Sequence, residues 1–549
     1  MQVPLTLGRW IAALVPIVVL FVLITSGRVK ARTAALAVTA VTVVLATAVY
    51  GAGPLVLGVA LVKGLWLGLW ILAVVWPAML LYQIASRAGL DRIGGLFASL
   101  FPNRSENLLV LAWLLPSFVQ GVAGFGAPIA VAAPLLIASG WSRGKAVIYP
   151  LVGYHWSVTF GSMGSSFYMA ALTAHLGSQF TETFARAAAL LLGVNCLVAG
   201  AIVVVLDGGV RGLRDGAPLL FGAGLPMAVT LYFVAPVVPA VGTVSAGAVG
   251  FAVALGIAWV GRLRRRTHGS PCPAGTVDPD GTAGAEPGTM VTERGATGGR
   301  GAIWLVAPYL YLVGTALVAL LVPASRQWIS THAVLGPSLP ATTTGLGWHN
   351  AAVARYTPLE VFGHPGVYLL LACLLGYLTY RATGLWHRAG RGRLVRDWLG
   401  SVQSTSISIV GLACVATVLM DAGMIATLAR GLVAVTGAAY PALAPLVGAL
   451  GSFLTGSSTS SNALFAALQA QVSQLLDVPA AVLLAAQTAG ANVGNSVAPV
   501  VVLIGLSAVD AQERLSRVVR TVAIVTLGLL VVVTGMTFAL LFFGDALLL

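Results

Sequence analysis

The chain has 549 residues, of which 58% are hydrophobic and only 8% are charged, and its net charge is +14. A soluble globular protein carries about 25% charged residues, so this composition excludes that class and predicts an all-α polytopic protein of the cell membrane. The basic residues stand in short loops between apolar blocks, without interleaved aromatic residues on a polar surface. We therefore expect the lipid bilayer, and no nucleic acid, as the surrounding partner.

Apolar runs alternate with short basic loops along the first part of the chain. The first runs cover Trp10–Thr25, Thr33–Tyr50 and Leu55–Ile84, and a crossing needs about 20 apolar residues. No basic region or small-residue cleavage site accompanies the first run, so we interpret it as a retained span. The loops after the first and third runs are basic, which predicts that both are cytoplasmic. They contain Arg28, Lys30 and Arg32, and Arg87, Arg92 and Arg104.

The segment Phe118–Gly140 has no charged residue, yet it is a poor continuous helix. Gly121, Gly124 and Gly126 crowd together, and two prolines follow. Glycine costs roughly 1 kcal/mol and proline about 3 kcal/mol inside a helix. At bilayer depth a helix can break only where protein or a water-filled cavity satisfies the freed backbone groups. The segment therefore predicts a broken span beside a cavity, with a kinked helix at a helix–helix contact as the alternative.

Residues 262–300 differ in composition from the rest of the chain. They begin with a basic run and continue with glycine, proline and threonine, which is typical of a flexible linker. The sequence thus predicts an N-terminal transmembrane half (residues 1–261), a cytoplasmic linker (residues 262–300) and a C-terminal transmembrane half (residues 301–549). The polar stretch Pro323–Pro365 is expected to be an extracytoplasmic surface loop. Its irregularly spaced histidines, and four cysteines far apart in the chain, predict no metal site and no cofactor.

Each half contains two polar or glycine-rich interruptions. They are Gln120–Pro134 and His155–Ser166 in the first half, and Thr455–Asn462 and Gln487–Pro499 in the second. Paired interruptions at matching positions are typical of transporters built from inverted repeats, with the site where the repeats meet. We expect roughly 12–14 transmembrane helices, two inverted-repeat halves and broken, re-entrant helices.

Two ionisable residues stand within apolar blocks and are candidates for proton coupling. Asp421 lies in VLMDAGMIA, although Gly423 and Arg430 leave open a position in a loop. His155 lies in an expected span, where a packed, hydrogen-bonded histidine is the alternative. Ionisable groups inside a membrane are functional candidates, and histidine titrates near neutral pH.

Four segments resemble the L-lactate permease family. They are GVAGFGAPIAVAAPLL (Gly121–Leu136), HWSVTFGSMGSSF (His155–Phe167), TGSSTSSNALFAALQ (Thr455–Gln469) and AAQTAGANVGNSVAP (Ala485–Pro499). The resemblance implies a carrier of lactate and glycolate with protons. Gln120 and Ser458 depart from the family pattern, where Glu and Asp or Asn are common, and both changes remove a possible proton or cation ligand.

Hydroxyls, amides and free backbone N–H groups can bind a carboxylate without a fixed charge. The predicted substrate-binding residues are Gly121, Gly124, Phe125, Gly126, Ser162, Ser165, Ser457, Ser458, Thr459, Ser460, Ser461, Asn462, Gln487 and Asn492.

The sequence therefore predicts a secondary transporter, not an enzyme, that imports L-lactate or a related small 2-hydroxy monocarboxylate by proton symport. The alternative is a sodium-coupled transporter of a dicarboxylate or another organic anion, with oxygen ligands from Asp421 and the Ser/Thr/Asn cluster. A membrane enzyme or scaffold is a further alternative, but the sequence has no HExxH or Walker motif that would support it. The oligomeric state stays open.

Overall fold

The computed structural model describes residues 3–26, 28–89, 100–101, 103–122, 124, 126–268, 300–386 and 393–548. Two of the predictions fall partly or wholly outside these residues. Phe125 is one, and residues 269–299 of the predicted linker are the other. The first seven linker residues continue a helix that ends at His268, and the next helix begins at Arg300.

The described chain is almost entirely helical, as predicted. In the first half the α-helices are α1 (Leu7–Thr25), α2 (Ala31–Tyr50), α3 (Pro54–Ala88), α5 (Arg104–Leu109), α6 (Leu115–Val122), α7 (Ala127–Ala138), α8 (Arg143–Tyr154), α9 (Ser165–Thr173), α10 (Ser178–Val234) and α11 (Gly242–His268). A π-helical turn joins α5 to α6, and 3-10 turns occur at His155–Ser157, Ser162–Gly164 and Pro239–Val241.

In the second half the α-helices are α12 (Arg300–Leu321), α13 (Pro323–Thr331), α14 (Pro365–Ala382), α15 (Leu394–Asp421), α16 (Met424–Thr436), α17 (Leu443–Thr455), α18 (Ser458–Leu476), α19 (Ala480–Val497), α20 (Pro499–Ser507) and α21 (Leu515–Leu548). Between α13 and α14 the chain forms two antiparallel ribbons. These pair β1 (Val334–Leu335) with β4 (Leu359–Glu360), and β2 (Thr342–Thr343) with β3 (His349–Asn350). The predicted surface loop is therefore partly ordered.

Nine helices in the described part of the chain are long and apolar enough to cross a membrane, or ten if the bent pair α19–α20 counts as one span. This is fewer than the 12–14 expected. The difference arises because several apolar blocks are divided into short helices, such as α7 with 12 residues and α16 with 13. In addition, α10 contains a residue with non-helical backbone angles, Gly209, so this long element consists of two helical segments joined at a kink.

Small residues bring the long helices into close contact. A Cβ atom on Gly64 of α3 would lie 2.5 Å from the Cα of Cys414 in α15, and one on Gly68 would lie 2.7 Å from Val410. In the second half, Gly490 and Gly494 of α19 lie directly against backbone carbonyls of α17. Close approach at glycine is the usual way that membrane helices associate, because lipid provides no hydrophobic drive for their packing.

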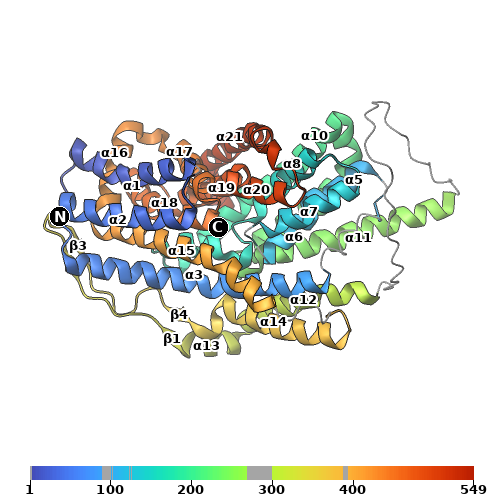
Figure 1. Ribbon diagram of the computed structural model, residues 1–549, viewed down its shortest axis with the longest axis horizontal. Coiled ribbons are helices and arrows are strands. Elements are labelled where there is room, and N and C mark those ends of the chain that lie inside the picture. Colours follow the sequence, from blue (N-terminus) through green and yellow to red (C-terminus); the bar gives the residue numbers. More distant parts are fainter. Residues whose placement is uncertain are drawn as a thin grey trace.

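Figure 1 shows how these helices are arranged along the molecule. Helices α1, α2 and α16 gather at the end where the N-terminus lies, and α5, α10 and α11 at the other end. Helices α12, α13 and α14 lie along one edge together with the strands. Helices α7, α19 and α20 lie near the middle, where predicted interruptions lie.

Candidate functional site

Both interruptions predicted in the first half are real breaks in helices. Helix α6 ends at Val122 and α7 begins at Ala127 after Gly126, whose φ of +89° favours glycine because an L side chain is strained there. Further on, the 3-10 turn after α8 leads to Ser162 and Met163, both in the left-handed region with φ of 46° and 55°. Helix α9 begins directly afterwards, at Ser165.

The second half has two corresponding breaks. Helix α17 ends at Thr455, and Gly456, with φ of +67°, turns the chain into α18. Ser457 caps α18, because its hydroxyl accepts a hydrogen bond from the backbone N–H of Ser460 at 3.3 Å. Helices α19 and α20 meet at Ala498 with a bend of 45°, and Pro499 begins α20.

These four breaks meet at one cavity, which we call the central cavity. Its lining residues come from every break, with Gln120, Tyr154 and Val158 from neighbouring turns. The lining consists of Gln120, Gly126, Tyr154, Val158, Ser162, Ser165, Gly456, Ser457, Ser458, Thr459, Asn495 and Val501. Among these described lining residues none carries a charge. The open space is about 30 Å³, which holds one or two water molecules.

Four helices begin at this cavity. Gly126 caps α7, Ser165 is the first residue of α9, Ser457 caps α18 and Val501 lies in the first turn of α20. The first N–H groups of a helix have no partner within the helix, and the helix dipole adds about half a positive charge at that end. Helix N-termini and hydroxyls can hold an anion without a cationic side chain, so this geometry makes the central cavity a candidate anion site.

A buried network of amides and hydroxyls joins the two halves beside the central cavity. The amide of Asn462 donates to the hydroxyl of Thr488 at 2.8 Å and to the backbone carbonyl of Ser166 at 2.9 Å. The hydroxyl of Thr159 donates to the carbonyl oxygen of the Asn492 side chain at 3.0 Å. Because the polar atoms bind one another across the interface, the network aligns α9, α18 and α19 with the turn after α8.

Comparison with known proteins adds the family. The sequence model of the L-lactate permease family matches residues 9–543. The chain belongs to the L-lactate permease family. It is therefore a multi-pass integral membrane protein of the cell membrane, and the permease names of the family indicate a transporter rather than an enzyme.

Two curated relatives and one solved structure illustrate the similarity. An L-lactate permease of Salmonella typhi is 27% identical over 481 residues, covering 84% of this chain and 83% of the relative. Glycolate permease GlcA of Escherichia coli K12 is 26% identical over 550 residues, covering 93% of this chain and 91% of the relative. The YdaH transporter of Alcanivorax borkumensis aligns with a TM-score of 0.47 and 14% identity over 89% of this chain and 88% of that one.

In this member of the L-lactate permease family, six predicted substrate-binding residues line the central cavity. They are Gly126, Ser162, Ser165, Ser457, Ser458 and Thr459. Gln120, Tyr154 and Asn495 also line it, although they are not among the predicted binding residues. Asn495 lies inside one of the shared sequence segments and Gln120 lies directly before another, a signal that could have identified them.

The other predicted binding residues that the structure describes are not among the lining residues of the central cavity. Gly121 packs on the backbone of Val244, and Gly124 lies directly against the hydroxyl of Ser162. The hydroxyl of Ser461 donates to the carbonyl of Gly448 at 2.8 Å. Asn462, Gln487 and Asn492 belong to the buried amide network or lie beside it. Ser460 lines a neighbouring groove.

His155 is buried in the turn after α8, adjacent in sequence to Tyr154 of the central cavity. Its Nδ1 lies 2.7 Å from the carbonyl oxygen of Val152, so Nδ1 carries the hydrogen. Its Nε2 is buried and has no hydrogen-bond partner in the described part of the chain. A proton added at Nε2 would thus be a buried charge without a partner.

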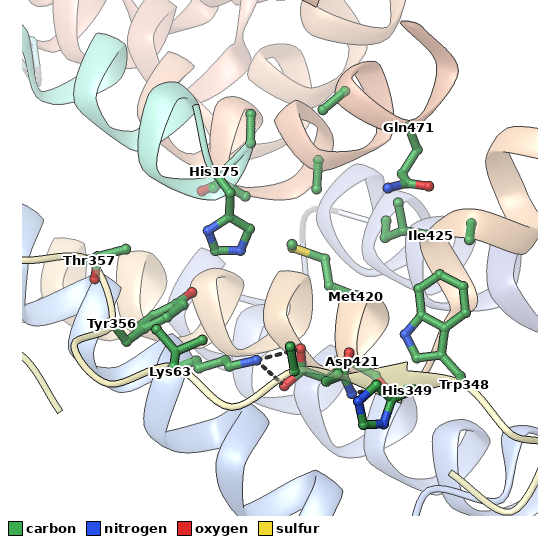
Figure 2. A pocket seen from close by; sticks show the side chains of 18 of the residues that line it. Lys63, His175, Trp348, His349, Tyr356, Thr357, Met420, Asp421, Ile425 and Gln471 are labelled. Atoms are coloured by element: carbon green, nitrogen blue, oxygen red, sulfur yellow. Dashed lines mark hydrogen bonds and ion pairs between the residues drawn. The ribbon is translucent and has the colours of Figure 1, made fainter. Parts of the chain in front are cut away.

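Asp421 lies in a different place, at the end of α15. Its carboxylate accepts two hydrogen bonds from the Nζ of Lys63 in α3, at 2.8 and 2.9 Å. The two side chains are 10% and 7% exposed, for Lys63 and Asp421 respectively. Lys63, which the sequence presented only as an interruption of an apolar run, is therefore the partner of Asp421. Figure 2 shows this pair at the floor of a second cavity.

This second cavity, which we call the outer cavity, has a volume of about 600 Å³. Helices α3, α15, α16 and α18 form its walls together with the segment around β3 and the turn after α9. Tyr356 and Trp348 from the loop stand on opposite sides of the ion pair, and His175 faces it from the turn after α9 (Figure 2).

Proposed function

We propose that this protein imports L-lactate, or a related small 2-hydroxy monocarboxylate such as glycolate, by proton symport. The names of its relatives, L-lactate permease and glycolate permease, support this substrate class. The observation that carries the proposal is the meeting of four helix N-termini at the central cavity. Such an arrangement provides backbone N–H groups for a carboxylate and hydroxyls for a neighbouring hydroxyl group.

The lack of charge in the described lining of the central cavity favours a small monoanion. Each helix N-terminus contributes about half a positive charge within its first turn. Two or more N-termini therefore balance one carboxylate without a cationic side chain. Because the open space is about 30 Å³, the helix tips must separate to admit a substrate, and a small anion requires the least separation.

Coupling to a proton fits a monocarboxylate, because the pair crosses the membrane without net charge. His155 and Asp421 are the two candidates for the proton carrier. His155 has a buried Nε2 that can take a proton, and Asp421 can release Lys63 when it is protonated. Protonation leaves a positive charge on His155 in one case, and on Lys63 without its partner in the other. The carboxylate of the substrate compensates this charge, so each candidate favours uptake of the proton together with an anion.

The alternative of sodium-coupled dicarboxylate transport requires oxygen ligands for Na⁺. Asp421 is the acidic ligand that this alternative requires, but its two oxygens accept hydrogen bonds from Lys63. An ammonium group at 2.8–2.9 Å occupies the position that a cation would need. We therefore favour the proton, and the experiment below keeps Na⁺ as an outcome.

The function is tested by uptake of radiolabelled L-lactate into proteoliposomes, with pH and Na⁺ gradients imposed separately. We expect accumulation with an inward proton gradient and none with a Na⁺ gradient at equal pH. Competition by unlabelled glycolate should exceed competition by succinate. Uptake that follows only the Na⁺ gradient would replace this proposal by the alternative.

Two serines test the position of the site. Ser458→Ala and Ser165→Ala each remove one hydroxyl from the central cavity. The loss of one hydrogen bond of about 1 kcal/mol raises the KM for lactate roughly fivefold. Ser473→Ala is the matched control in α18, because that hydroxyl donates to the carbonyl of Ala470 in its own helix. An unchanged KM in both test variants would remove the central cavity from the transport path.

A further inference from the structure

The outer cavity lies on the extracytoplasmic side of the membrane. Helix α2 begins directly after the basic loop that contains Arg28 and Lys30, and ends at Tyr50, so α3 begins on the opposite side. Helix α15 begins beside Arg393 and Arg396 and ends at Asp421. Since basic loops stay in the cytoplasm, Lys63, in the third turn of α3, and Asp421 are both near the outer surface.

The Lys63–Asp421 pair is costly for a structural contact. Removing two charges from water has a large desolvation cost, and replacing such a pair with apolar residues is often neutral or stabilising. This pair also does not fill its surroundings, because it faces a cavity of about 600 Å³. The backbone carbonyl of Asp421 accepts a hydrogen bond from the amide of Asn350 at 2.9 Å, which fixes its position at the wall of the cavity.

Two further hydrogen-bond donors line the outer cavity without a partner in the described part of the chain. They are the hydroxyl of Tyr356 and the indole N–H of Trp348, and both atoms are buried. The Tyr356 ring also lies 5.6 Å from the Nζ of Lys63. Buried donors normally have acceptors. The residues that line the outer cavity therefore carry an ammonium and two buried donors without acceptors, a set that suits an anion with a carboxylate and a hydroxyl group.

We propose that the outer cavity binds the substrate before it reaches the central cavity, and that the carboxylate of the substrate replaces Asp421 on Lys63 when Asp421 takes up a proton. In this exchange the proton moves from the outer solution to a carboxylate oxygen of Asp421. The ammonium of Lys63 keeps its charge and changes its partner. The proposal rests on the proposed function, and it identifies where anion and proton are bound together.

Three other titratable groups face the ion pair across the outer cavity. His175, from the turn after α9, and His349, from β3, are exposed to solvent. Each can therefore exchange a proton with water directly, without any change in the Lys63–Asp421 pair. Nδ1 of His349 lies 3.1 Å from the hydroxyl of Thr343. Tyr356 provides a phenol, which stays neutral in the range in which carboxylates titrate. Asp421 is thus the group whose protonation changes the charge that Lys63 faces.

The test is equilibrium binding of radiolabelled L-lactate to the purified full-length protein between pH 5 and pH 8. If each anion binds together with one proton, binding weakens as the proton concentration falls. The affinity of the unmodified protein for lactate should therefore decrease up to tenfold for each unit by which the pH rises. Asp421→Asn leaves Lys63 without its carboxylate at every pH, so this variant should bind tightly with little pH dependence. Lys63→Gln should bind at least tenfold more weakly at pH 5.

A second ion pair between the same helices provides the matched control. Arg87 of α3 and Asp397 of α15 pair at 2.6 Å, near the cytoplasmic ends of the two helices. Asp397→Asn breaks that pair, and its binding should keep the pH dependence of the unmodified protein. The double variant Lys63→Gln with Asp421→Asn replaces the ion pair by two neutral amides. It should retain the thermal stability of the fold and still bind weakly.

The outcomes separate this proposal from the proposed function. If Asp421→Asn and Lys63→Gln bind lactate with the affinity and pH dependence of the unmodified protein, the outer cavity is not a binding site, even where proteoliposome uptake succeeds. If the unmodified protein fails to transport lactate but the variants change lactate binding as predicted, the anion site stands and the proposed transport function fails.

Discussion

The side-chain amide of Asn462, in the second half of the chain, donates to both the carbonyl oxygen and the hydroxyl of Ser166, in the first half, over 2.9 and 3.0 Å. The same amide reaches Thr488 of α19 at 2.8 Å. One buried side chain therefore connects three helices at the point where the broken segments meet. The sequence predicted substrate contact for Asn462, but the structure gives its donors to protein groups.

Asn462→Ala should consequently lower the thermal stability of the protein, whereas its effect on the KM for the substrate should be small. It leaves the carbonyl of Ser166 and the hydroxyl of Thr488 without their donor, at a cost of about 1–3 kcal/mol. The measurement is thermal unfolding of the detergent-solubilised protein. Asn195→Ala is the control, because within the described part of the chain that amide donates to the carbonyl of Leu191 in its own helix. A normal unfolding temperature together with a raised KM would restore the substrate contact.

Gly126 should not tolerate a side chain. Its φ is +89°, and a Cβ atom would lie 2.7 Å from Cδ1 of Ile504 in α20. The left-handed backbone alone costs an L residue roughly 1–2 kcal/mol. We expect Gly126→Ala to slow uptake and Gly126→Leu to abolish it, at normal membrane expression.

The contact with Ile504 makes this prediction more specific. In Gly126→Ala, a second change, Ile504→Val, should restore part of the lost uptake, since it removes the atom that the new Cβ meets. Gly535→Leu in α21 is the control, because a Cβ there has no neighbour within 4 Å among the described residues. Wild-type uptake by Gly126→Leu would show that the break before α7 has no role in transport.

The breaks in the helices could be predicted because their cause is local. Glycine and proline between residues 120 and 134 destabilise a helix wherever it lies, and the structure breaks it there. The bend at Ala498, before Pro499, has the same origin. The turn at Ser162 and Met163 is different, since two non-glycine residues adopt positive φ. Only the surrounding packing can impose that conformation, so propensity does not predict it.

The pairing of residues across the fold could not be predicted. Lys63 and Asp421 are 358 residues apart, and each alone reads as an isolated charge in an apolar block. Sequence patterns report period and composition but not which helices are neighbours. For the same reason the sequence grouped Ser457 to Asn462 as one binding cluster. A helix directs consecutive residues to different sides, so Ser458 faces the central cavity while Ser461 faces α17.

His364 should make stability sensitive to acid. It was predicted to lie in a surface loop, but it is buried beside Trp70, and its Nδ1 accepts a hydrogen bond from the N–H of Gly366 at 3.2 Å as the cap of α14. Burial lowers the pKa of His364 to about 4, against an ordinary value of 6.5. The unfolded chain thus binds the proton first. The stabilisation is complete above pH 6.5 and is lost as pH falls from 6.5 towards 4.

His364→Asn keeps a capping oxygen and removes the titration. Between pH 7.5 and pH 5 the unmodified protein should lose up to about 2 kcal/mol more stability than this variant. The unfolding temperature, measured across that range for both proteins, is the readout. Equal acid sensitivity in the two proteins would mean that His364 is protonated as readily in the fold as in the unfolded chain.

The last prediction concerns the path of the proton through His155. Its Nε2 is buried without a partner in the described part of the chain, so a proton there is favourable only with an anion nearby. His155→Gln keeps a hydrogen-bonding side chain and removes the titratable nitrogen. This variant should lose accumulation of lactate driven by a pH gradient but keep exchange with preloaded substrate, because exchange does not require release of the proton.

Voltage provides the complementary measurement. Proton and monocarboxylate together carry no net charge, so an imposed potential should leave initial uptake by the unmodified protein almost unchanged. One uncompensated charge crossing 100 mV would add about 2.3 kcal/mol of driving force, which is easily detected. If His155→Gln still accumulates lactate against its gradient while Asp421→Asn does not, the proton travels through Asp421 alone. If both variants accumulate lactate, neither His155 nor Asp421 carries the proton. The undissociated acid is then the transported species.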